Sequence, residues 1–109
     1  MNREIKDLNI LSKFCEEFCN IIDKHCQYIV VSGFVAIASG RTRGTEDIDM
    51  IIEKISYEKF KEIFKELKEN NFICMQSDGA EEIYDYLKEK TAVRFTWKNK
   101  PLPEMEIKF

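Results

Sequence analysis

Asp47 and Asp49 stand two residues apart in a segment where acidic and apolar side chains alternate. This alternation predicts a β-strand over residues 46–52, because side chains two apart on a strand project from the same face. We expect the two carboxylates to lie about 6.6 Å apart along the strand and to repel each other unless a cation binds between them. Mg²⁺ suits such a pair, since it takes oxygen ligands and keeps waters for substrate phosphates.

Upstream of this pair, Ser32 and Gly33 follow a β-branched run and precede the apolar run 34–39. The first run predicts a buried central strand over residues 28–32, and the second predicts a short buried helix. A glycine at that junction lets a ligand approach the backbone, and the N–H groups of a helix start attract phosphate. A phosphate site beside a metal site is the arrangement used for in-line phosphoryl and nucleotidyl transfer.

Three pieces of sequence then form a combined pattern. They are Ser-Gly-Phe-Val-Ala at 32–36, Gly40, and Arg-Gly-Thr-Glu-Asp-Ile-Asp at 43–49. Together they resemble the signature of the nucleotidyltransferase superfamily, which has the DNA polymerase beta-like fold. The resemblance is closest to the minimal and abortive-infection toxin-type branches, and it covers residues 28–52. It implies a mixed-sheet domain that uses a nucleoside triphosphate.

The resemblance also implies the catalytic and metal-binding residues. Asp47 and Asp49 correspond to the pair that binds two Mg²⁺ or Mn²⁺ ions. The family takes a third carboxylate from a later strand, within an apolar-acidic-apolar triplet. Glu106, between Met105 and Ile107, fits that triplet although aspartate is commoner there, and Glu104 is the reserve candidate.

By the same resemblance, the nucleotide-binding residues are Ser32, Gly33, Phe34, Arg43 and Thr45. The triphosphate would lie over the glycine, and the arginine would contact phosphate or the acidic cluster. A large aromatic side chain stands where the family usually has a second glycine or a serine. That departure removes one close phosphate contact from a small residue or hydroxyl.

Simpler interpretations exist for these acids. Asp47 and Asp49 are also compatible with a solvated strand face at a sheet edge, where charges oppose aggregation. Glu104 and Glu106 alternate as an ordinary solvent face does, and Arg94 on a neighbouring predicted strand can pair with either of them.

The remaining pattern predicts one domain over residues 1–109, of the α/β (α+β) class. It is a mixed β-sheet with packed helices, nucleotidyltransferase-like, with a long N-terminal helix. Helices are predicted at 3–25, from an N-cap at Ser56 to about residue 70, and at 80–90; further strands are predicted at 72–76, 92–97 and 105–109. A strand running to the last residue also raises the hypothesis that the chain is the N-terminal fragment of a longer protein.

Composition narrows the function classes. The net charge of −3 argues against a broad basic surface for nucleic acid, so a polyanionic substrate must be held locally by metal ions or a few arginines. No apolar stretch is long enough to span a membrane, and the charged N-terminus lacks a secretory signal, which predicts a cytoplasmic protein. Cys15, Cys19 and Cys26 fall on the apolar stripe of the first helix, which favours core packing over a disulfide or a zinc site.

The sequence therefore predicts a metal-dependent nucleotidyltransferase that transfers a nucleoside monophosphate from a nucleoside triphosphate and releases pyrophosphate. The acceptor stays open among RNA ends, proteins and small molecules. The alternative is a non-catalytic protein of the same fold that acts as a binding or toxin-antitoxin partner module. A third hypothesis is a structural domain whose long N-terminal helix forms a homo-oligomer.

Overall fold

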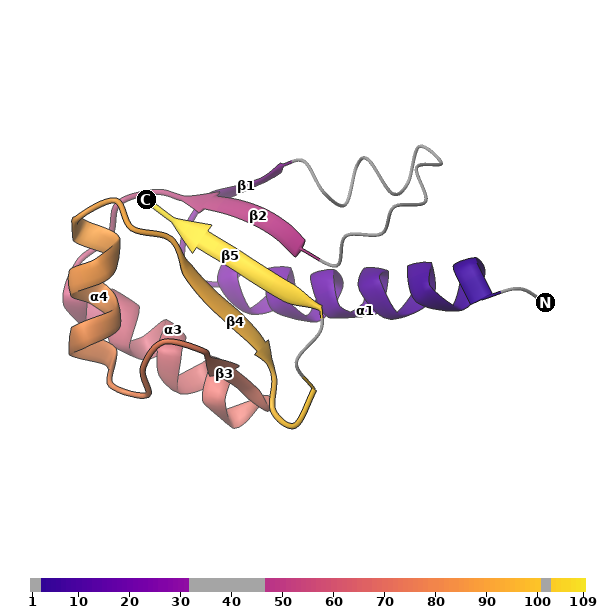
Figure 1. Cartoon of the computed structure of the whole chain (residues 1–109). Helices are drawn as coiled ribbons and strands as arrows, with labels where there is room; N and C mark the ends of the chain where they lie inside the picture. Colours follow the sequence, from indigo (N-terminus) through magenta and orange to yellow (C-terminus); the bar gives the residue numbers. More distant parts are fainter. Residues whose placement is uncertain (1–2, 32–46, 101–102) are drawn as a thin grey trace.

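A computed structural model describes residues 3–31, 47–100 and 103–109, with the backbone alone for 3–9 and 47. Within this part of the chain, three helices and five strands follow one another along the sequence (Figure 1). They are α1 (Arg3–Asp23), β1 (Tyr28–Val31), β2 (Asp47–Ile52), α3 (Tyr57–Glu69), β3 (Phe72–Cys74), α4 (Ala80–Lys88), β4 (Val93–Trp97) and β5 (Glu104–Lys108). The order matches the predicted one except where residues are not described.

The five strands form one mixed sheet in the order β1-β2-β5-β4-β3. β2 and β5 run parallel in its middle, while the other neighbouring strands are antiparallel. The described helices pack on one face of this sheet (Figure 1). The predicted α+β class with a mixed sheet is therefore confirmed.

The core lies between that face and the helices. Phe14 and Phe18 on α1 are fully buried and one helical turn apart, so both reach the sheet. The ring of Phe18 meets Phe72 edge to face at 5.2 Å and lies 5.6 Å from Phe95, measured between centroids. These contacts join α1 to β3 and β4, which form an antiparallel pair.

α3 begins where the sequence predicts. The Ser56 hydroxyl accepts a hydrogen bond from the Lys59 N–H at 3.2 Å, which caps the first turn. The buried stripe of this helix consists of Phe60, Ile63, Phe64 and Leu67. This spacing of three and four residues fixes which side of α3 faces the sheet.

The prediction of a central buried strand at 28–32 is wrong. In the sheet as described, β1 is an edge strand that pairs with β2 alone, and 61% of Ile29 is exposed. An apolar run shows that a strand is present but does not tell a central strand from an edge strand with an apolar outer face. The short helix predicted at 34–39 lies outside the described residues.

The cysteines of α1 support the packing interpretation. Cys15 is buried in the core and Cys19 packs against it, with the two sulfur atoms 3.8 Å apart as free thiols. Cys26 also packs against the core. Among the described helices, none has the length and apolar composition needed to cross a membrane.

Candidate functional site

The middle of the sheet brings acidic residues from distant parts of the sequence together. In the parallel pairing of β2 with β5, Asp47 lies opposite Glu104 and Asp49 lies opposite Glu106. Neighbouring strands are about 4.8 Å apart, so each acid has another acid beside it. The residues between them on both strands are buried in the core, so strand alternation puts Asp49, Glu104 and Glu106 on the opposite face. We call this set of four residues the acidic face.

Arg94 on β4 completes the acidic face from the next strand. It lies opposite Glu106 in the antiparallel pairing, and its Nε atom is 3.2 Å from Glu106 Oε2 and 3.9 Å from Glu104 Oε1. One guanidinium therefore stands between two glutamates, as the simpler interpretation of these residues predicted. It offsets part of their repulsion and holds their side chains toward β4.

The last residue of β1 also lies beside these acids. Val31, the last residue of β1, is opposite Asp49, and Ser32 follows it directly in the chain. The described end of β1 therefore lies beside the acidic face, as a phosphate site next to a metal site requires. The other predicted nucleotide-binding residues, Gly33, Phe34, Arg43 and Thr45, lie with Ser32 outside the described residues.

The acidic face has the donor set of a hard divalent cation. Carboxylate oxygens are the ligands that Mg²⁺ and Mn²⁺ prefer, and Asp49 and Glu106 offer them from adjacent strands. Asp47 adds a third position by backbone register, although its side chain is not described. Among the side chains that are described, no group of three or more His, Cys, Asp or Glu is arranged to hold a metal ion.

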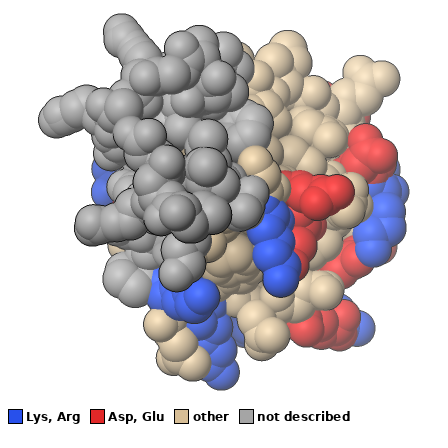
Figure 2. All heavy atoms as spheres, turned by 90° about the vertical axis from the view of Figure 1, so that its right-hand side faces the viewer, with Lys and Arg blue, Asp and Glu red and all other residues tan. Residues whose placement is uncertain are grey.

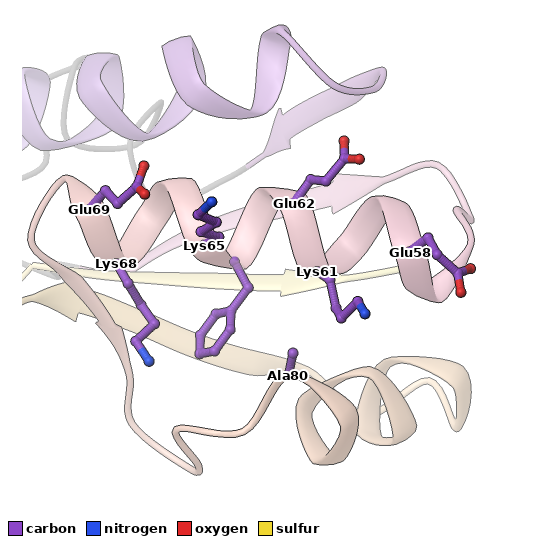
Figure 3. Close-up of a pocket in the computed structure, with 8 residues that line it drawn as sticks. Glu58, Lys61, Glu62, Lys65, Lys68, Glu69 and Ala80 are labelled. Atoms are coloured by element: carbon purple, nitrogen blue, oxygen red, sulfur yellow. The ribbon is translucent and has the colours of Figure 1, made fainter.

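A different hollow lies on the helical side of the molecule. It is a groove of about 720 Å³ lined by Glu58, Lys61, Glu62, Phe64, Lys65, Lys68, Glu69 and Ala80. Figure 3 shows Lys61 and Lys68 turned toward Ala80, whereas Glu62 and Glu69 point the other way. The charges alternate along the exposed side of α3, as they do on a solvated helix. Nothing in this groove converges on a ligand.

The residues of the acidic face were identified from the sequence, but the side-by-side pairing of β2 and β5 was not predicted. Asp49 and Glu106 are far apart along the chain, and only the parallel register places them side by side. A second polar hollow, which contains Lys13, Lys98 and Lys100, was missed. The signal available was a pair of lysines flanking Asn99 in a predicted turn.

Comparisons of the chain with protein-family models, with curated proteins and with solved structures find no match. A functional conclusion therefore rests on the chain's own residues and their geometry.

Proposed function

We propose that this protein is a metal-dependent nucleotidyltransferase. It would transfer a nucleoside monophosphate from a nucleoside triphosphate to an acceptor, with pyrophosphate as the leaving group. The observation that carries the proposal is the register that sets Asp49 beside Glu106 and Asp47 beside Glu104 on one sheet face. The sequence resemblance adds the triphosphate, because the glycine segment begins directly after Val31, opposite Asp49.

Each residue has a defined part in this proposal. Asp47, Asp49 and Glu106 would hold two Mg²⁺ or Mn²⁺ ions, which would neutralise the phosphates and activate the acceptor. The Nε atom of Arg94 contacts Oε2 of Glu106 at 3.2 Å. Arg94 therefore positions the glutamate instead of binding the nucleotide. The acidic face is not needed for the core, which lies on the other side of the sheet.

The proposal places the protein in the cytoplasm. Its four cysteines are free thiols, and the cytoplasm keeps thiols reduced.

The test is metal-dependent binding and transfer of labelled nucleotide. The protein is incubated with each α-labelled nucleoside triphosphate, Mg²⁺ or Mn²⁺, and RNA, protein or small-molecule acceptors. We expect transfer, and we expect Asp49→Asn to reduce it by about a hundredfold or more, since one ligand of the metal site is lost. Asp78→Asn is the matched control, because it removes the same charge from an exposed turn.

Two results would contradict the proposal. One is the absence of both transfer and metal-dependent nucleotide binding in the wild-type protein. The other is a signal that Asp49→Asn and Asp47→Asn leave unchanged.

The second candidate is a non-catalytic module that binds a partner protein. The observation that favours it is Arg94, which already supplies a positive charge to Glu104 and Glu106. Two of the four acids thus have a positive partner that is not a metal ion. This candidate predicts that Mg²⁺ leaves the melting temperature unchanged, whereas the transferase predicts an increase.

A further inference from the structure

A polar depression of about 540 Å³ lies where α1 meets the turns after α3 and β4. It is lined by Ile10, Lys13, Glu17, Asn70, Asn71, Trp97, Lys98, Asn99 and Lys100. We call it the lysine depression. Its lining combines ammonium groups, side-chain amides and one indole ring, and none of them belongs to the acidic face.

The charge of this depression is opposite to that of the whole chain. Three lysines line it against one glutamate, although the protein has a net charge of −3. The glutamate, Glu17, accepts a hydrogen bond from the Trp97 indole N–H at 3.1 Å. In the described part of the chain, Lys13, Lys98 and Lys100 form no ion pair with a carboxylate. Their charges are therefore available to an anionic ligand.

The depression is held by fixed turns. The Lys98 N–H donates to the Asn71 carbonyl oxygen at 2.6 Å, which ties the turn after β4 to the turn after α3. Asn71 and Asn99 both have left-handed backbone conformations, with φ of 70° and 69°. Asparagine tolerates this conformation better than most residues, so both turns are compatible with their sequence. The amide and ammonium groups thus project from a defined surface.

Trp97 gives the depression an aromatic wall. Its ring packs edge to face on Phe14 with 5.0 Å between centroids, so the core holds it in place. The Lys100 ammonium lies over the indole at 5.4 Å from the ring centroid. Lys100 covers the indole in this structure, so a ligand with both a phosphate and a flat base would draw Lys100 to the phosphate and stack its base on the ring in place of the ammonium.

The lysine depression and the acidic face share one end of the sheet. Trp97 ends β4, and Glu104 begins β5, with Lys100 between them in the chain. Four residues of chain span at most about 14 Å, so Lys100 lies within that reach of Glu104. Figure 2 looks onto this end of the molecule and shows lysine or arginine side chains along the lower border of the grey residues. A short polymer can therefore contact both places.

We propose that the lysine depression binds the phosphodiester backbone of single-stranded RNA, with one base on Trp97. Three lysines that form no ion pair with a described carboxylate, beside an aromatic ring, match the way single strands are held, by phosphate contacts and base stacking. The depression is concave and contains one ring, which suits an unstacked base and not the closed stack of a duplex. The part of this inference that makes the RNA an acceptor rests on the proposed transferase, whereas binding itself does not.

The experiment measures RNA binding without divalent ions. A labelled oligoribonucleotide of about 12 nucleotides is titrated with protein in EDTA, and binding is followed by anisotropy. Trp97 is the only tryptophan, so quenching of intrinsic fluorescence by the unlabelled strand reports on the same site. We expect K13Q/K98Q/K100Q to weaken binding about tenfold or more and to reduce the slope of log K against log salt by about 2.

The matched control is K61Q/K65Q/K68Q, which removes the same number of charges from α3. We expect it to bind as the wild type does. K98Q/K100Q, which keeps Lys13, gives an intermediate loss and guards against misfolding of the triple variant. The inference is overturned if both triple variants lose affinity equally or if neither does. It is also overturned if duplex RNA or inorganic pyrophosphate competes as well as the single strand, since the site then takes another ligand.

Asp49→Asn separates this inference from the proposed function. The variant should bind RNA normally in EDTA while metal-dependent nucleotide binding is lost. If the wild type binds RNA through its lysines but shows no metal-dependent nucleotide binding, the proposed transferase function is wrong and the RNA-binding site is supported. If nucleotide transfer occurs but the lysine variants bind RNA normally, the RNA site falls and the transferase stands.

Discussion

Alternate residues of β2 and β5 build two surfaces with different tasks. Ile48 and Ile107 point into the core and are fully buried, whereas Asp49 and Glu106, one position along each strand, lie on the acidic face. Burial on the first face stabilises the fold, since each such side chain contributes about 1.5–3 kcal/mol. The second face gathers like charges, which add no comparable stability. The contrast shows that stability and the proposed chemistry can be altered separately.

The contrast can be tested within one strand by comparing Ile48→Ala with Ile51→Ala. Ile48 is fully buried, while 39% of Ile51 is exposed. We expect Ile48→Ala to lower the free energy of unfolding by about 2–5 kcal/mol, because it leaves a cavity. Ile51→Ala should cost less than about 1 kcal/mol. Urea denaturation measures both, and equal losses would show that the outer face is also covered.

Adding Mg²⁺ tests the acidic face directly. A ligand that binds only the folded state stabilises it by about 2.7 kcal/mol at one hundredfold above its Kd. We expect Mg²⁺ to raise the wild-type melting temperature accordingly and Asp49→Asn to abolish the increase. Asp78→Asn should keep it. A wild-type protein that melts at the same temperature with and without Mg²⁺ has no such metal site.

Arg94 sharpens the comparison, because it is the cation of the acidic face. Its side chain is half exposed, so Arg94→Gln should lower the free energy of unfolding by less than about 1 kcal/mol in metal-free buffer. Without the guanidinium, the carboxylates lose their positive neighbour, so added Mg²⁺ should stabilise this variant more than the wild type. Arg94→Lys keeps the charge and should behave between the two. Thermal melts with and without Mg²⁺ measure the effect. An equal rise of the melting temperature in the wild type, Arg94→Gln and Arg94→Lys would contradict the role of Arg94 as a positive neighbour of these carboxylates.

Glu66 on α3 is a carboxylate on the helix-covered side of the sheet, and it can be compared with the carboxylates of the acidic face. Hydrogen bonds from Lys24 and His25 lower the pKa of Glu66 below its ordinary value. Because its pKa is lower in the folded state, ionised Glu66 stabilises the protein at pH values above the ordinary pKa of about 4.3. This stabilisation is lost as the pH falls through the folded-state pKa.

Glu66→Gln should therefore lower the free energy of unfolding by less than about 1 kcal/mol at pH 7 and should not change it in strong acid. Denaturation at several pH values measures the difference. Glu62→Gln, on the same helix, is the control. A cost that stays constant down to strong acid would mean that the charge of Glu66 is not responsible.

Much of this fold follows from local pattern. The stripe of α3, the cap at Ser56 and the alternation of β2 were predictable because periodicity and capping depend on neighbours in sequence. The edge position of β1 was not predictable in this way, because the pairing of a strand depends on the whole sheet. For the site, the residue types at Asp49 and Glu106 were recognisable, but their contact depends on a register between distant strands. The lysine depression was not predicted, because residues from α1 and from two separate turns form it.

The parallel pairing of β2 with β5 has a consequence for biosynthesis. On the ribosome, β2 emerges long before β5, and the intervening segment must fold as a crossover before the two can meet. Pairing of such distant segments is slow, because the loop between them must close first. Until β5 docks, Asp49 has no Glu106 beside it. A nascent or truncated chain therefore carries only half of the acidic face, so any activity that depends on it begins only after β5 has been synthesised.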